Sequence, residues 1–219
     1  VLQVSALALA VSAATGAHAV DKWTYEVTVT NITYNQRFTP VLVATHKPDI
    51  ALFKLGQPAS PALATLAEEG NVAPLRTILD GSPSVASTAA APGLLDPGKS
   101  ITLTVQGNPW RDRLSLAAML IPTNDAFVAL STVGLPAYGG TVTYIARAYD
   151  AGSEVNDELC SSIPGPFFDE CGGSGGGARV GGGEGFVHVH RGIHGVGQLK
   201  ASARDWRNPV AEVRVRWVR

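Results

Sequence analysis

The chain has 219 residues, of which 45% are hydrophobic and only 16% are charged. This composition favours a folded protein with a sizeable core and excludes a long disordered chain. The 17 lysine and arginine residues nearly balance 18 acidic residues, so the chain lacks the basic excess that nucleic-acid binding requires, and we expect no nucleic-acid partner.

The first 19 residues carry no charged side chain, are rich in leucine, valine and alanine, and end in Ala17-His18-Ala19. An apolar stretch followed by small residues is typical of a secretory signal peptide. We therefore expect a signal peptide over residues 1–19 and one exported domain over residues 20–219. A membrane-spanning helix is less favoured, because the stretch is short and no later segment reaches about 18 apolar residues.

Residues 23–34 alternate polar with β-branched or aromatic side chains, a period of two that predicts a half-buried strand. Residues 41–45 predict a second strand. The pair Ser60-Pro61 is typical of a helix start and Gly70 of a helix end, so a short helix is expected between them. Residues 74–79 are a candidate for a second helix. Residues 81–98, rich in serine, alanine, proline and glycine, are predicted to form a loop.

The remaining strand signals favour an antiparallel β-sandwich, because many short strands alternate with turn residues and little helix is predicted. The glycine-rich residues 172–185 predict a flexible loop, which lacks the ending of a phosphate-binding loop. The further strands are predicted over residues 100–105, 114–121, 127–130, 141–148, 186–190, 198–203 and 210–218.

The chain has two cysteines, Cys160 and Cys171, separated by a loop-like stretch. An exported protein meets an oxidising environment, so we expect one local disulfide between them. The alternative is that both thiolates bind a metal ion, which would need further ligands nearby.

Two predicted loops concentrate oxygen ligands. One, residues 122–127, contains Asp125, and the other, residues 149–158, contains Asp150 and Glu154. Calcium takes about six to eight oxygen ligands, which loops at one end of a sandwich can supply. The alternative is that Asp125 caps a turn and that the second loop is an ordinary solvated acidic loop.

Histidines gather in residues 185–195. His188 and His190 are two apart on a predicted strand and so point to the same face, and His194 follows a glycine turn that could bring it back toward them. Three convergent imidazoles suit Zn²⁺ or Cu²⁺, and an open coordination position would permit hydrolytic or redox chemistry. The alternative is a surface whose histidines bond to neighbouring backbone or face water.

Three segments resemble the spondin domain, which is found in F-spondin-type matrix proteins and in single-domain bacterial homologues. They are residues 25–34 followed by Phe38-Thr39-Pro40, residues 118–130, and residues 149–154 with the sequence Tyr-Asp-Ala-Gly-Ser-Glu. The resemblance spans roughly residues 23–217. It implies a C2-like β-sandwich with a calcium ion held by three acidic side chains.

Carried over by position, the acid of the family's Pro-Ser-Pro-Asp-Trp segment falls on Asp125. The two acids of its Tyr-Asp-Ala-Gly-Thr-Asp segment fall on Asp150 and Glu154. The resemblance thus implies these three residues as calcium ligands. The sequence departs from the family at Ala126, where an aromatic residue is usual, and at Glu154, where aspartate is usual. Glutamate is longer but remains a competent oxygen ligand.

The sequence contains no recognisable framework of serine, histidine and aspartate, so we expect no enzyme. We expect an all-β, calcium-binding module that is secreted, periplasmic or on the cell surface and serves adhesion or recognition. Its partner would be an extracellular or cell-surface protein or glycan, without membrane insertion of the mature chain. Two alternatives remain: a transition-metal protein or metalloenzyme that uses the three histidines, and a purely structural exported domain.

Overall fold

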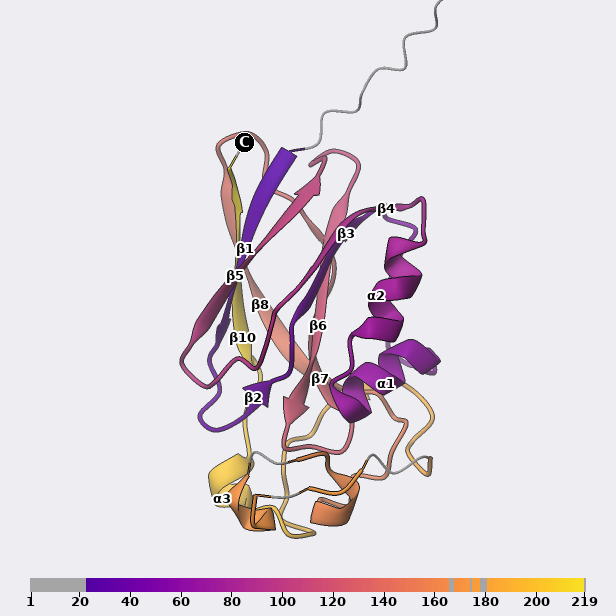
Figure 1. The fold of residues 1–219 in the computed structure, drawn as a ribbon, viewed down its shortest axis with the longest axis vertical. Coiled ribbons are helices and arrows are strands. Elements are labelled where there is room, and N and C mark those ends of the chain that lie inside the picture. The colour runs from indigo at the N-terminus through magenta and orange to yellow at the C-terminus, as the bar shows by residue number, and fades with distance from the viewer. Residues whose placement is uncertain (1–22, 166–167, 174, 178–180, 219) are drawn as a thin grey trace, which may run out of the picture.

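A computed structural model describes residues 23–165, 168–173, 175–177 and 181–218 (Figure 1). The expected signal peptide over residues 1–19 lies outside the described residues. Within this part of the chain, ten strands pair antiparallel throughout. They are β1 Trp23–Asn31, β2 Arg37–Phe38, β3 Leu42–His46, β4 Val85–Ala90, β5 Ser100–Gly107, β6 Arg113–Ile121, β7 Ala126–Gly134, β8 Thr141–Asp150, β9 His188–Val189 and β10 Ala211–Trp217.

The strands form two facing layers. Their order is β4-β3-β6-β7-β8-β10-β1-β5, with β2 paired to β6 and β9 paired to β8. The strand path curls so that β5, at one end of the order, packs against β3 and β4 at the other (Figure 1). In β1, alternate residues are buried, and Tyr25, Val27 and Val29 enter the core between the layers. The period of two in the sequence therefore predicts the buried face of this strand, and the predicted all-β antiparallel sandwich is confirmed.

Two short helices cover the outer face of the layer that contains β3, β6 and β7 (Figure 1). They are α1 Pro61–Glu69 and α2 Ala73–Asp80. Ser60 caps α1 by accepting a hydrogen bond from the Leu63 amide at 3.2 Å, and Gly70 ends the helix, as the sequence predicts. A second core lies beneath the helices and explains why β6 is buried along almost its whole length. Among the described residues, no helix is long and apolar enough to cross a membrane.

Three predicted elements differ from the structure. Residues 81–98 are not all loop, because Val85–Ala90 form β4 and pair with β3; the hydrogen bonds of this pairing outweigh a local composition that favours turns. Residues 198–203 form no strand, since Ala201–Arg204 form the single-turn helix α3. The strand expected over residues 186–190 is limited to His188–Val189, which pair with Asp150 and Tyr149 of β8.

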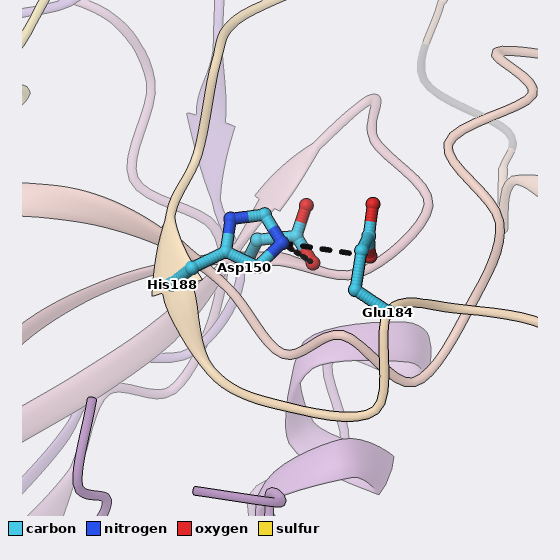
Figure 2. A group of neighbouring side chains, drawn as sticks. All are labelled: Asp150, Glu184 and His188. Carbon is cyan, nitrogen blue, oxygen red and sulfur yellow. Dashed lines mark ion pairs between the residues drawn. The ribbon is translucent and has the colours of Figure 1, made fainter. Parts of the chain in front are cut away.

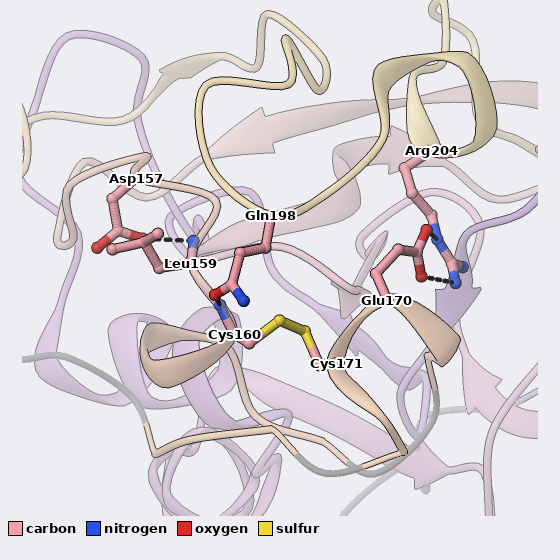
Figure 3. Close-up of a disulfide and its surroundings, with 7 residues drawn as sticks. All are labelled: Asp157, Leu159, Cys160, Glu170, Cys171, Gln198 and Arg204. Carbon is pink, nitrogen blue, oxygen red and sulfur yellow. Dashed lines mark hydrogen bonds and ion pairs between the residues drawn. A yellow bond between two sulfur atoms is a disulfide. The ribbon is translucent and has the colours of Figure 1, made fainter.

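A disulfide closes part of the long connection between β8 and β9 at one end of the sandwich (Figures 1 and 3). Cys160 and Cys171 form the expected disulfide, with their Cα atoms 5.5 Å apart. Beside it, the guanidinium of Arg204 donates hydrogen bonds of 2.8 and 2.7 Å to the carboxylate of Glu170. These bonds lower the pKa of Glu170, although its burial acts in the opposite direction. The disulfide segment is therefore attached to α3 by a buried ion pair.

Aromatic side chains gather at the opposite end of the sandwich, where β1 begins and β10 ends. The ring of Trp23 packs against those of Trp110, Tyr138 and Trp217, with centroids 4.8 to 6.2 Å apart. The two ends of the molecule thus differ: one carries an aromatic cluster, and the other carries the acidic loops described next.

Candidate metal centre

Asp125 lies in the short loop between β6 and β7 and is fully buried. Thr123 shapes this loop, because its hydroxyl donates to the Leu120 carbonyl and accepts from the Ala126 amide. The Oδ2 atom of Asp125 accepts three hydrogen bonds: from the Ser153 amide at 2.8 Å, the Ser153 hydroxyl at 3.1 Å and the Glu154 amide at 3.0 Å. Asp125 therefore ties its own loop to the loop that follows β8.

Asp150 is the last residue of β8 and stands opposite Ala126, the first residue of β7. Its Oδ1 accepts a bond of 2.7 Å from the Gly152 amide, and its Oδ2 accepts one of 2.8 Å from the Asn156 side chain. These two bonds hold the carboxylate in one orientation. Because Asp125 directly precedes β7, the β7–β8 pairing brings the two aspartates together.

Glu154, the third predicted ligand, is fully buried four residues after Asp150. Its backbone amide is bonded to Asp125, so all three acids lie in two adjoining loops at one end of the sandwich. The structure thus brings together the residues that the family resemblance implies, although they are far apart in the sequence.

The electrostatics of this end favour a cation. Burial, together with the neighbouring charge of Asp150, raises the pKa of Asp125 to about 7, although the hydrogen bonds from Ser153 and Glu154 act in the opposite direction. Burial also raises the pKa of Asp150. The Oδ1 atom of Asp125 is buried without a hydrogen-bond partner in the described chain. Among the described residues, no lysine or arginine forms an ion pair with either aspartate.

Two of the predicted histidines flank Asp150. His188 stands directly opposite Asp150 in the β8–β9 pair, and its Nε2 lies 3.6 Å from Asp150 Oδ1. The Nε2 of His190 lies 3.7 Å from the other oxygen, Oδ2. His194 is exposed; it donates its backbone amide to Glu158 and lines, with His190 and Asp150, a cavity of about 110 Å³. The acidic set and the histidine set, which the sequence suggests separately, therefore share Asp150.

The two histidines near Asp150 carry their ring hydrogens on different atoms. The Nδ1 of His188 lies 3.1 Å from the Val189 carbonyl and donates to it, so in the neutral ring the lone pair is on Nε2. The Nδ1 of His190 accepts from the Gly192 amide at 2.9 Å, so its Nε2 carries the hydrogen. Burial lowers the pKa of His190 to about 3, which keeps this ring neutral. Burial also opposes a charge on His188, but the Val189 carbonyl and the carboxylates of Asp150 and Glu184 together raise the pKa of that ring.

Glu184 is a site residue that sequence reasoning missed. It lies near the end of the glycine-rich residues 172–185, and its Oε2 is 3.5 Å from His188 Nε2 (Figure 2). The nearby amide of Gly185 donates to the Gly152 carbonyl at 2.8 Å, which holds Glu184 and Gly185 against the loop after β8. One sequence signal was available: Glu184 is the only acid in residues 172–185 and precedes His188 by four positions.

The family model named Spondin_N matches residues 21–157, which is more than half of the chain and includes all three predicted calcium ligands. No curated protein matches the sequence. A spondin domain together with a disulfide indicates an extracellular protein, and the domain indicates a module of the recognition or adhesion type. With the fold, the paired acidic loops and this match in agreement, the chain belongs to the Spondin_N family.

Proposed function

We propose that the protein is an extracellular recognition module that binds calcium and has no catalytic activity of its own. Asp125, Asp150 and Glu154 would hold the ion. The family resemblance supports this assignment, and the burial of all three side chains in adjoining loops supports it independently.

The observation that carries the proposal is the buried Oδ1 atom of Asp125, which has no hydrogen-bond donor in the described chain and lies near a second buried carboxylate. Two buried like charges close together are strongly unfavourable. Uptake of a proton or a cation by the pair relieves this repulsion. An all-oxygen set of carboxylates suits a hard divalent cation such as Ca²⁺, which can bind at neutral pH in place of the proton.

Calcium would act by joining two loops that end different strands. The loop of Asp125 follows β6, and the loop of Asp150 and Glu154 follows β8. Loops held on a rigid sheet are where recognition commonly resides, and a bound ion would reduce their motion. The partner would be an extracellular or cell-surface protein or a glycan, contacted by these loops.

Calorimetric titration of the chelator-treated full chain with Ca²⁺ tests the proposal. We expect about one equivalent to bind to the wild type and none to Asp125→Asn, which keeps the size of the side chain but removes its charge. Asp49→Asn is the matched control, because Asp49 is an exposed aspartate with a single hydrogen bond from Ser84, and this variant should bind calcium as the wild type does. A wild type that binds no calcium would exclude the proposal.

A further inference from the structure

We propose that Asp150, Glu184 and His188 form a second metal site, for a divalent transition ion such as Zn²⁺, beside the acids assigned to calcium. The site does not depend on the calcium proposal, except that both sets contain Asp150. It differs from the three-histidine alternative that the sequence suggests, because two of its three ligands are carboxylates.

The distances between the three side chains fit ligands around a shared metal ion better than they fit direct hydrogen bonds between the side chains. His188 Nε2 lies 3.6 Å from Asp150 Oδ1 and 3.5 Å from Glu184 Oε2 (Figure 2). These separations are too long for good hydrogen bonds. In a tetrahedral zinc site with bonds of about 2.1 Å, neighbouring ligand atoms are about 3.4 Å apart. One ligand atom from each residue lies within 4.8 Å of the others, so a small movement of Glu184, whose side chain is 37% exposed, would complete the geometry.

The ring of His188 is oriented as a metal ligand requires. Its Nδ1 donates to the Val189 carbonyl, which leaves the lone pair of the neutral ring on Nε2, and Nε2 is buried without a hydrogen-bond partner in the described chain. Histidines that bind metals commonly donate the other ring N–H to a carbonyl or carboxylate in this way. His190 has the opposite arrangement, because the Gly192 amide occupies its Nδ1 and Nε2 therefore keeps its hydrogen.

The backbone holds the three ligands in place. The antiparallel β8–β9 pair sets His188 directly opposite Asp150, so both side chains project from the same face. Glu184 is positioned by the hydrogen bond from Gly185 to Gly152, the residue two places after Asp150. An imidazole nitrogen with two carboxylates is a mixed donor set, which suits Zn²⁺ and its neighbours better than Ca²⁺, since calcium prefers oxygen ligands only. Three protein ligands leave one position for water or for a donor from a partner.

Zinc titration of the full chain, in the presence of saturating calcium, tests this second site. We expect one equivalent of Zn²⁺ to bind, and Co²⁺ in its place to give the intense visible absorption of a tetrahedral complex. The variants His188→Ala and Glu184→Gln should each weaken zinc binding by at least about 100-fold, since even the loss of an outer contact costs about 10- to 100-fold. Both variants should retain calcium binding, because neither changes an acid of the calcium set.

Three further variants separate the outcomes. Asp125→Asn should lose calcium but keep zinc, and Asp150→Asn should lose both, so failure of one proposal is distinguishable from failure of the other. His194→Ala should leave zinc binding unchanged, because no described contact joins its ring to the three ligands. If His194→Ala abolishes zinc binding while Glu184→Gln does not, the three-histidine set is the metal site instead. If the wild type binds no zinc, His188 is only an ion-pair partner of the two carboxylates and the proposal is wrong.

Discussion

The replacement Asp125→Asn has opposite expected effects with and without calcium. In the metal-free protein the pKa of Asp125 is about 7, against an ordinary value of 3.8. The folded state therefore holds this proton more tightly than the unfolded state does, and stability falls as pH rises from about 4 through about 7. At about 1.4 kcal/mol per pKa unit, the loss above pH 7 is roughly 4 kcal/mol. Asparagine carries no charge and avoids this loss.

Asparagine can still accept the bonds from the Ser153 and Glu154 amides through its side-chain oxygen. Burying its new amide group costs about 1–3 kcal/mol. In chelator at pH 8, we therefore expect the variant to be more stable than the wild type by about 2 kcal/mol. For a domain of this size, that difference raises Tm by about 4–8 °C. At pH 5 the advantage should disappear, because Asp125 of the wild type is then protonated.

Calcium should reverse the order. A ligand at about a thousandfold excess over its Kd stabilises the folded state by about 4 kcal/mol, and only the wild type would gain this. The wild type should then be the more stable protein by about 2 kcal/mol. Thermal unfolding followed by circular dichroism, in chelator and in calcium, measures both differences. If Asp125→Asn is destabilised by the same amount in both conditions, the buried charge of Asp125 is not unfavourable in the metal-free protein, and the electrostatic reasoning fails.

Three further variants test the surroundings of the site. Gly152→Ala should lower the free energy of unfolding by at least about 2 kcal/mol and weaken zinc binding, because φ is +66° and the new Cβ would lie 2.3 Å from the Phe186 carbonyl oxygen. The matched control Gly56→Ala, with φ of +75° and open space around the new Cβ, should lower it by only about 1–2 kcal/mol in the same urea unfolding assay. Glu158→Gln should lower the free energy of unfolding by about 2 kcal/mol, because the Glu158 carboxylate accepts hydrogen bonds from the backbone amides of residues 194–196. It should also accelerate hydrogen exchange of these three amides, and unchanged exchange would contradict the prediction. Glu170→Gln should lower the free energy of unfolding by about 3 kcal/mol at pH 7, because it leaves the buried Arg204 without its charge partner. The pKa of Glu170 is lowered in the folded state, so the stabilisation by this ion pair is present above the ordinary pKa of 4.5 and is lost as pH falls. Variant and wild type should therefore have similar stability in urea unfolding at pH 3.

The strands with a clear period of two could be predicted from the sequence, whereas those that depend on distant partners could not. The alternation in residues 23–34 identifies β1 because one face of this strand meets the core. In contrast, Val85–Ala90 has no strong strand signal of its own and becomes β4 through its pairing with β3. Residues 198–203 show the opposite case: a strand is predicted there, but Ala201–Arg204 form the helix α3 and residues 198–203 belong to none of the described strands.

In the candidate site, too, some residues could be predicted from the sequence and others depend on distant partners in the fold. Family resemblance implies Asp125, Asp150 and Glu154, and the structure places them in adjoining loops. Spacing also singles out His188 and His190. Neither source relates the histidines to Asp150, because that contact depends on the β8–β9 register, which joins segments 38 positions apart. Glu184 could not be found from local pattern, since its place beside His188 depends on the hydrogen bond from Gly185 to the distant Gly152.

The four tryptophans are divided between the two ends of the molecule in a way that makes their fluorescence informative. Trp23, Trp110 and Trp217 belong to the aromatic cluster at one end, and Trp110 is 69% exposed. Trp206, only 7% exposed, packs against the ring of His190 with centroids 4.9 Å apart, next to Asp150. A water-soluble quencher would therefore suppress much of the emission from the aromatic end while sparing Trp206. The blue-shifted signal that remains would report events around Asp150 without any attached dye.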